Sequence, residues 1–129
     1  MSMALVNRVD KRVRMDKQGI VKYQLLTHCF LNDIQISDSD LKCLTELGIA
    51  GERELTEFCS YVAEQNIFKT PQSARNAITK AEKKRLLVKI GKNRKTIRLN
   101  EDIKLQTEGT VFLDYKFVSV ESEEVQADN

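Results

Sequence analysis

The pair Thr70-Pro71 constrains the fold of this 129-residue chain more than any other local feature. Threonine is a good N-cap because its side-chain oxygen accepts a hydrogen bond from a backbone N–H of the first turn, and proline is favoured at the first helical position. The pair therefore predicts a helix that begins at Pro71. Small apolar residues then recur at helical spacing, namely Ala74, Ala77, Ile78 and Ala81. We expect this face of the helix to pack and the opposite face to be available for binding.

A β-hairpin is expected directly after this helix. Residues 86–90 and 96–99 are short runs rich in Leu, Val, Ile and Thr, and the five residues 91–95 between them include one glycine and three basic residues. Short β-prone runs separated by a turn of this length are typical of a hairpin. The sequence therefore predicts a helix followed by a hairpin with a basic tip.

The same segment carries most of the positive charge of the chain. Residues 69–98 contain eleven basic residues and one acidic residue, a net charge of +10, whereas the whole chain has a net charge of only +2. Residues 1–30 have a net charge of +4, and residues 31–68 and 99–129 each have a net charge of −6. Because solvated surfaces usually mix both signs, this segregation favours binding of a polyanion over a merely soluble surface.

Three further helices are expected before Thr70. Apolar residues at helical spacing predict a helix over residues 20–35, and Ser37 followed by Asp40 has the capping pattern of a second, short helix that ends between Gly48 and Gly51. A third helix is expected from Glu52 to about Asn66, with acidic residues in its first turn. Residues 110–118 alternate as a strand does, and residues 9–16 are a candidate partner for that strand.

This order of helices and basic hairpin resembles a winged helix-turn-helix domain, the architecture of MarR-like regulators and of many plasmid and phage replication proteins. The resemblance covers about residues 20–100 and is most specific from Thr70 to Val88, which is similar to the recognition helix and first wing strand. It implies an α+β fold with about four helices, a hairpin wing and additional terminal strands. Two residues depart from the family pattern. Arg85 replaces the usual glycine, so it either adopts the costly left-handed conformation or the helix ends differently, and Ala81 replaces a larger apolar residue.

We divide the chain accordingly into an N-terminal basic arm or strand (1–19), a winged helix-turn-helix domain (20–100), an extra C-terminal strand region (101–120) and an acidic tail (121–129). In the family, the recognition helix enters the major groove of DNA and the wing reaches the backbone or minor groove. The resemblance then implies that candidate contacts to bases or phosphates are Gln72, Ser73, Arg75, Asn76 and Thr79. Candidate contacts to phosphates alone are Lys80, Lys83, Lys84, Lys92, Arg94 and Lys95. If about six of these neutralised phosphates, the log-log salt slope of binding would be about −5.

Other function classes find little support in the sequence. His28 and Cys29 are adjacent, so their side chains point about 100° apart on a helix and do not face each other as a base and a nucleophile must. Cys29, Cys43 and Cys59 are an odd number of cysteines at wide spacing, which disfavours disulfides and a zinc site. We therefore expect a non-enzymatic protein without a metal or cofactor.

The expected partner is double-stranded DNA, with a homodimer expected by analogy. No apolar run approaches the length of a membrane span and the first residues lack that of a signal peptide, so we expect a cytoplasmic protein. The leading hypothesis is a transcriptional regulator or a replication or packaging accessory of a phage or mobile element. The alternative is a virion structural adaptor, a head, portal or neck component that uses the same fold for contacts with other virion proteins, since a fold does not fix function.

Overall fold

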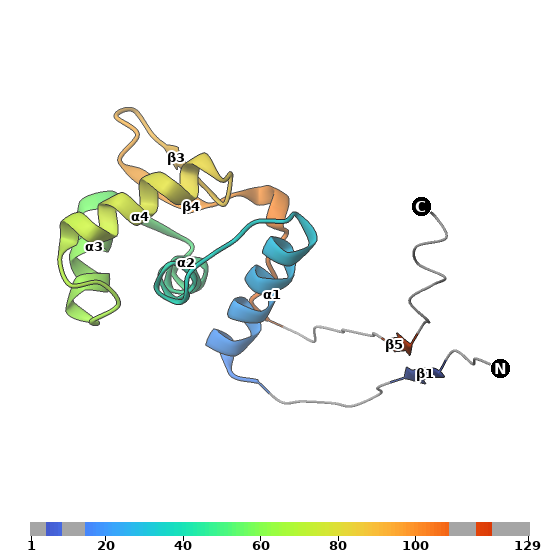
Figure 1. Ribbon diagram of the computed structural model, residues 1–129. Helices are drawn as coiled ribbons and strands as arrows, with labels where there is room; N and C mark the ends of the chain where they lie inside the picture. Colours follow the sequence, from blue (N-terminus) through green and yellow to red (C-terminus); the bar gives the residue numbers. More distant parts are fainter. Residues whose placement is uncertain (1–4, 9–14, 109–115, 120–129) are drawn as a thin grey trace, which may run out of the picture. The chain divides into compact units, whose positions relative to one another are not determined.

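The computed structural model describes residues 5–8, 15–108 and 116–119, and it divides into two compact units (Figure 1). The terminal unit comprises Met1–Arg14 and Thr110–Asn129, and the helical unit comprises Met15–Gly109. In the terminal unit, β1 (Leu5–Arg8) pairs antiparallel with β5 (Lys116–Ser119). The N-terminal region therefore does pair with the expected C-terminal strand.

The prediction that residues 9–16 supply the partner strand was wrong for its last part. Asp16 is the N-cap of a helix and not a strand residue, because its Oδ1 accepts a hydrogen bond of 2.8 Å from the backbone N–H of Gly19. Residues 9–14 of that prediction, and 110–115 of the other strand, lie outside the described residues. The pairing that the structure describes uses residues 5–8 instead.

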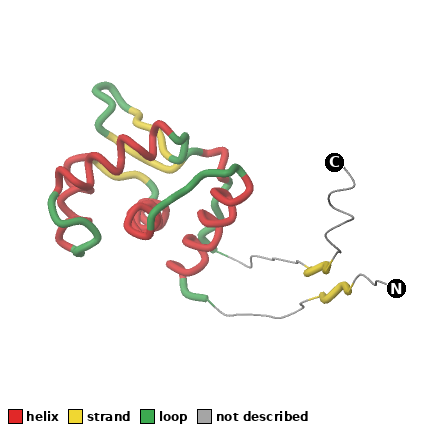
Figure 2. Tube along the Cα trace, in the orientation of Figure 1, coloured by secondary structure: helices red, strands yellow, loops and turns green. Residues whose placement is uncertain are grey.

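The expected α+β fold with about four helices is confirmed, and the helical unit also contains a three-stranded antiparallel sheet, of which only the β3-β4 hairpin was expected. The helices are α1 (Lys17–Leu31), α2 (Asp38–Ala50), α3 (Leu55–Glu64) and α4 (Pro71–Lys83). The strands are β2 (Glu52–Glu54), β3 (Leu87–Ile90) and β4 (Thr96–Leu99), in the order β2-β4-β3, and the short 3-10 helix η1 (Glu101–Ile103) follows β4. Helix α1 packs on α2 and helix α3 packs on α4 (Figure 2).

The first two helices differ from their expected bounds only at the ends. Helix α1 begins earlier than predicted because of the Asp16 cap, and it ends at Leu31, where Asp33 takes the left-handed conformation with φ 57°. Ser37 is the N-cap of α2 as predicted, since its Oγ accepts from the Asp40 N–H at 3.2 Å. Gly48 lies inside α2, and the helix ends before Gly51, whose φ of 88° suits glycine.

The prediction that a helix begins at Glu52 was wrong. Residues 52–54 form strand β2, whose backbone pairs with β4 so that Arg53 lies opposite Ile97. Helix α3 then begins at Leu55, because the carboxylate of Glu54 accepts a hydrogen bond of 2.8 Å from the Glu57 N–H and caps the first turn. Glu52 and Glu54 therefore lie in strand β2, and Glu54 is also the N-cap of α3.

The predicted start of α4 is confirmed. Thr70 Oγ1 accepts from the Ser73 N–H at 3.0 Å, and Pro71 is the first helical residue. The helix ends with Arg85 in the left-handed conformation, at φ 63°. The Arg85 N–H donates to the Glu82 carbonyl at 3.0 Å and the Leu86 N–H donates to the Ala81 carbonyl at 2.9 Å, which is the hydrogen-bond pattern of a Schellman motif. Of the two alternatives for Arg85, the chain adopts the costly one.

One hydrophobic core joins the helices to the sheet. Each of the four α-helices contributes fully buried side chains, for example Leu25, Leu47, Phe58 and Ile78, and Ile97 contributes from β4. The predicted β-hairpin is confirmed, with β3 and β4 paired from Leu87 opposite Leu99 to Ile90 opposite Thr96. Because the short Schellman turn joins α4 to β3, the hairpin begins directly after the end of α4. Buried Leu86 and Leu87 then anchor the start of β3 in the core.

Candidate functional site

The outward face of α4 is a polar stripe. Ala74, Ala77, Ile78 and Ala81 are buried against the rest of the helical unit, as the sequence predicted. The opposite side carries four exposed residues at helical spacing, which we call the outer stripe: Gln72, Asn76, Thr79 and Lys83. Three of these four side chains are uncharged hydrogen-bonding groups. The stripe therefore presents an amide and hydroxyl surface with a single charge at its C-terminal end.

Two amide side chains of the outer stripe are hydrogen-bonded to each other. Gln72 Nε2 donates to Asn76 Oδ1 at 3.0 Å, and Thr79 Oγ1 donates to the backbone carbonyl of Arg75 at 3.1 Å. Ser73 lies to one side and takes part in the helix start, since its Oγ accepts from Thr70 Oγ1 at 3.0 Å. The Gln72 and Asn76 side chains thus form an ordered pair that can hydrogen-bond a planar partner.

The basic residues that flank the outer stripe contact neighbouring elements instead. Lys80 Nζ forms an ion pair of 2.8 Å with Asp40 on α2. Lys84 Nζ donates to the backbone carbonyl of Gln35 at 2.6 Å, and Arg75 Nη2 donates to Thr56 Oγ1 on α3 at 3.2 Å. Three of the predicted contact residues therefore already bind groups within the protein.

Arg94 at the hairpin tip is also paired. Its guanidinium forms an ion pair with Glu82, the only acidic residue of the basic segment, and Lys89 Nζ lies 3.6 Å from the same carboxylate. This contact ties the hairpin tip to α4. The other two predicted tip residues, Lys92 and Lys95, are exposed and form no ion pair with another described residue.

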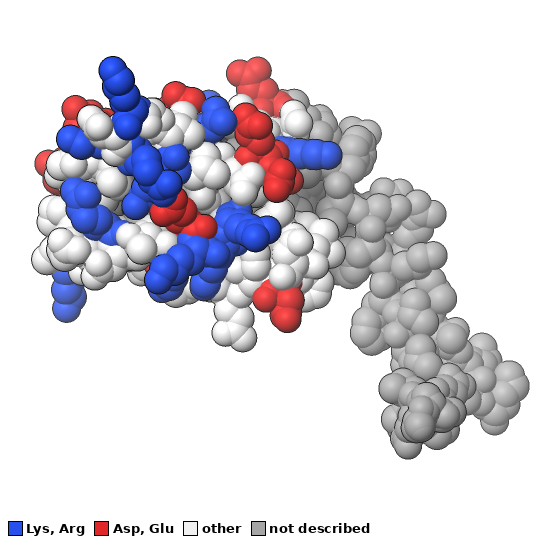
Figure 3. Space-filling model, turned by 90° about the horizontal axis from the view of Figure 1, so that it is seen from above, with Lys and Arg blue, Asp and Glu red and all other residues white. Residues whose placement is uncertain are grey.

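The predicted site residues therefore fall into two groups. The first group is exposed, and the side-chain hydrogen bonds that its members form are all with residues of α4 or its N-cap. We call this group the binding face: Gln72, Ser73, Asn76, Thr79, Lys83, Lys92 and Lys95. The second group is engaged with other elements or with Glu82: Arg75, Lys80, Lys84 and Arg94. The view in Figure 3 shows basic side chains spread over one side of the molecule with acidic side chains among them. The cation density available to a ligand is thus lower than the sequence count suggested.

Two basic residues that were not assigned to the site lie at its borders. Lys69 is exposed and directly precedes the Thr70 cap, and Arg85 is exposed at the turn between α4 and β3. Both were within the +10 segment but had no predicted role. Their position follows from their place in the chain, since Lys69 directly precedes the N-cap Thr70 and Arg85 directly follows the C-cap Lys84.

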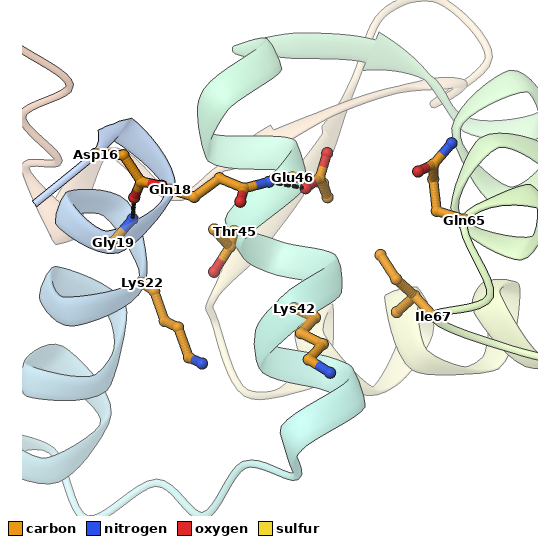
Figure 4. A pocket seen from close by; sticks show the side chains of 9 residues that line it. All are labelled: Asp16, Gln18, Gly19, Lys22, Lys42, Thr45, Glu46, Gln65 and Ile67. Carbon is orange, nitrogen blue, oxygen red and sulfur yellow. Dashed lines mark hydrogen bonds between the residues drawn. The ribbon is translucent and has the colours of Figure 1, made fainter.

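A groove between α1 and α2 is a weaker candidate. It has a volume of about 400 Å³ and its lining includes Lys22, Lys42, Gln18 and Glu46 (Figure 4). Two polar side chains of the lining already have partners, since Gln18 Nε2 donates to Glu46 Oε2 at 2.8 Å and Lys42 pairs with Asp38, outside the lining, at 3.2 Å. Glu46 also accepts from the Tyr61 hydroxyl at 3.0 Å, which raises the pKa of Tyr61. Glu46 on α2 thus links α1, through Gln18, to α3, through Tyr61. The groove is therefore explained by the packing of these three helices.

The cysteines are buried core residues with free thiols. Burial raises the pKa of Cys29, Cys43 and Cys59, and for Cys43 it raises the pKa to about 12. A thiol that keeps its proton is a poor nucleophile and a poor metal ligand. Among the described residues, His, Cys, Asp and Glu side chains form no cluster that could hold a metal ion. Within the same residues, no helix is both long enough and apolar enough to cross a membrane.

No family model, no curated protein and no solved structure matches this chain.

Proposed function

We propose that this protein is a small, non-enzymatic DNA-binding protein of the winged helix-turn-helix type. The order of elements supports the proposal, because β2 separates α2 from α3, the α3-α4 pair follows, and the β3-β4 hairpin completes a sheet of order β2-β4-β3. In this interpretation α4 is the recognition helix and the hairpin is the wing. We propose that the protein acts in the cytoplasm. Its role there would be that of a transcriptional regulator, or of a replication or packaging accessory of a phage or mobile element.

The observation that carries the proposal is the contact between α4 and the tip of the hairpin that follows it. The Arg94–Glu82 ion pair joins the tip to the helix, so the amide stripe and the tip lysines lie on two elements that contact each other. The major groove of B-DNA is about 12 Å wide and admits an α-helix with its side chains. A helix that enters this groove would leave the adjoining hairpin near the phosphate backbone.

The residue types of the binding face suit a division of roles. Gln72 and Asn76 carry side-chain amides, which can pair bidentately with N6 and N7 of adenine. Lys83 ends the outer stripe, and Lys92 and Lys95 lie at the hairpin tip, where ammonium groups can neutralise phosphates. Amide contacts would supply sequence preference, and the lysines would supply most of the salt-dependent affinity.

The structure lowers the expected salt dependence of that affinity. Of six residues assigned to phosphates by sequence, Lys80, Lys84 and Arg94 already contact groups of the protein. Three remaining lysines would give a log-log salt slope of about −2.7, compared with about −5 for six contacts. A slope near the larger value would require these three cations to exchange their present partners for phosphates.

A salt titration of duplex binding tests the proposal. The full chain is titrated into fluorescent random and genomic duplexes while anisotropy is followed, with a Lys83/Lys92/Lys95→Ala variant beside the wild type. The matched control is Lys17/Lys22/Lys42→Ala, which removes the same charge from α1 and α2. We expect the first variant to lose most of its affinity and its salt slope, and the control to lose little.

Two results would overturn the proposal. One is the absence of duplex binding by the wild type at low salt. The other is an equal loss of affinity in both triple variants, since that would mean that only net charge attracts DNA. Arg75→Ala is less informative than the sequence suggested, because it also removes the contact with Thr56.

A further inference from the structure

Glu82 is the one acidic residue of the basic segment 69–98, and its carboxylate lies where α4 contacts the hairpin. This carboxylate has two cationic neighbours. Lys89 Nζ on β3 lies 3.6 Å from Glu82 Oε1, and the Arg94 guanidinium at the hairpin tip forms an ion pair and a hydrogen bond with Glu82 Oε2. The cluster therefore contains one negative and two positive charges, so one of its cations is in excess.

The two cations of this cluster differ in how far they are buried. The Lys89 side chain is 18 % exposed, whereas the Arg94 side chain is 65 % exposed. A buried ammonium group requires a counter-charge, and among the described residues Glu82 is the only acidic group within ion-pair distance of Lys89. Lys89 therefore needs the carboxylate, whereas water can solvate Arg94 without it. Arg94 is thus the cation that the cluster could give up to a ligand.

The backbone of the hairpin tip holds Arg94 close to the carboxylate. Arg94 has φ 56°, in the left-handed region, and its N–H donates to the Gly91 carbonyl at 3.1 Å. Glu82 lies in the last turn of α4, and its side chain is only 27 % exposed. Hydrogen bonds between a guanidinium and a carboxylate are stronger than those between neutral groups. A phosphate would therefore have to displace a charged contact that is already formed within the chain.

We propose that Glu82 withholds Arg94 from DNA, so that the ion pair between α4 and the hairpin tip is autoinhibitory. Arg94 stays on the carboxylate when the binding face meets a duplex, and Lys83, Lys92 and Lys95 contact the phosphates. This inference rests on the proposed function, because it concerns the same surface. A guanidinium can bind a phosphate with two parallel hydrogen bonds. Holding it back limits the sequence-independent affinity and leaves base contacts a larger share of the total.

Salt titrations of duplex binding by the full chain test this inference. Glu82→Gln keeps the shape and the helix propensity of the side chain but removes its charge. We expect the log-log salt slope of this variant to be steeper than that of the wild type by about 0.9, the contribution of one more phosphate contact. The variant should bind about eightfold more tightly at about 0.1 M salt, and the gain should vanish as the salt concentration approaches about 1 M.

Variants of Arg94 identify the cation that Glu82→Gln releases. Arg94→Gln alone should leave the salt slope of the wild type unchanged, because Arg94 makes no phosphate contact there. Glu82/Arg94→Gln should return from the steeper slope to that of the wild type. Glutamine is used because it retains a Cβ, so the backbone cost of the left-handed conformation at position 94 stays the same. A shallower slope in Arg94→Gln would contradict the inference, since Arg94 would then already contact a phosphate.

Two further variants separate the release of Arg94 from changes in net charge and in stability. Glu82/Lys89→Gln keeps the net charge and leaves no buried ammonium without its partner, so it decides the question should Glu82→Gln fail to fold. Its slope should also be steeper by about 0.9. Glu64→Gln removes the same charge at an exposed residue at the end of α3. It should keep the wild-type slope and an affinity within about twofold, since distant surface charges are screened.

Two other results would overturn the inference. One is an unchanged slope in both folded Glu82 variants. The other is a lower duplex affinity of folded Glu82→Gln, because the ion pair would then support binding instead of opposing it.

Failure of the proposed function is a separate outcome, namely a wild type that binds no duplex at low salt. The same four chains, the wild type, Glu82→Gln, Arg94→Gln and Glu82/Arg94→Gln, are then titrated with heparin, a polyanion without bases. A steeper salt dependence in Glu82→Gln that disappears in Glu82/Arg94→Gln would still support the withholding of Arg94. A heparin affinity that Glu82→Gln leaves unchanged would overturn it.

Discussion

Lys80 Nζ on α4 lies 2.8 Å from Asp40 Oδ2 in the first turn of α2. Asp40 is one of only two polar or charged residues in the buried set of the described residues, and its side chain is 11 % exposed. A carboxylate at this depth requires a partner, and Lys80 supplies it. A residue that the sequence assigned to phosphate binding thus holds two helices together.

Replacing Lys80 by methionine should destabilise the fold by about 1 kcal/mol, because the substitution keeps the apolar stem but leaves the Asp40 carboxylate without its cation. The estimate is modest since the lysine itself is half exposed. Urea unfolding measures the effect. Lys83→Met is the control, because Lys83 is exposed on the outer stripe, and it should change the free energy of unfolding by less than about 0.5 kcal/mol. Equal effects of the two substitutions would contradict the role given to the ion pair.

Arg85→Gly should stabilise the protein by about 1 kcal/mol, since a left-handed backbone conformation is unfavourable for a residue with a Cβ and free of that cost for glycine. Thermal or urea unfolding measures the change. Lys84→Gly is the contrasting variant, because Lys84 has φ −84° and ψ 3° at the end of the helix and donates to Gln35. It should destabilise the protein, and a stabilisation by both variants would contradict the argument.

The strongest local signals in the sequence were sufficient to predict α4 and the hairpin that follows it. The Thr70-Pro71 start, the apolar spacing and the two β-prone runs depend on neighbours within a few residues, so they can be read without tertiary structure. Strand β2 could not be read in this way. Glu52, Arg53 and Glu54 have poor β propensity, and they form a strand only because β4, more than forty residues later, offers backbone groups for pairing.

The site was predictable to a similar degree. Helical spacing from Pro71 placed Gln72, Asn76 and Thr79 on the exposed face correctly. Which cations were available was not predictable, because the partners of Lys80 and Lys84 come from α2 and from the residue Gln35 before it. Net charge along a segment counts side chains, whereas the charge that a ligand meets depends on ion pairs formed across the fold.

Gly48→Ala should destabilise the protein by about 1 to 2 kcal/mol, although alanine is the better helix former. A Cβ at position 48 would lie 2.9 Å from Val21 Cγ1 and 3.0 Å from Leu99 Cδ1 and Leu105 Cδ2, so these three packed side chains would have to shift. Ser60→Ala on the exposed side of α3 is the control and should be neutral or slightly stabilising. A stabilising Gly48→Ala would show that this contact is loose.

The free energy of unfolding should fall as the pH rises above about 9. Burial, followed by the effects of Cys59, Asp40 and Glu46, raises the pKa of the Cys43 thiol from 9.0 to about 12. Between these values the folded chain keeps a proton that the unfolded chain loses, so stability decreases by up to about 1.4 kcal/mol per pH unit for this group. Below pH 9 the contribution is complete and constant. Urea unfolding at about pH 8 and about pH 10 measures the slope, and it should be shallower in Cys43→Ala. An unchanged slope in that variant would mean that Cys43 ionises in the folded state as in the unfolded one.

Asn76→Ala and Lys95→Ala should affect DNA binding in different ways. Asn76 lies in the middle of the outer stripe and shares a hydrogen bond with Gln72, so its loss should cost about 1 to 3 kcal/mol on a preferred duplex and little on random duplex. Lys95 lies at the hairpin tip, so its loss should weaken binding to all duplexes alike and reduce the log-log salt slope by about 1. Selection from a random duplex pool followed by anisotropy at several salt concentrations measures both. If Asn76→Ala lowered affinity equally for selected and random duplexes, α4 would contact the DNA backbone and not the bases, and the assignment of the outer stripe to sequence readout would be wrong.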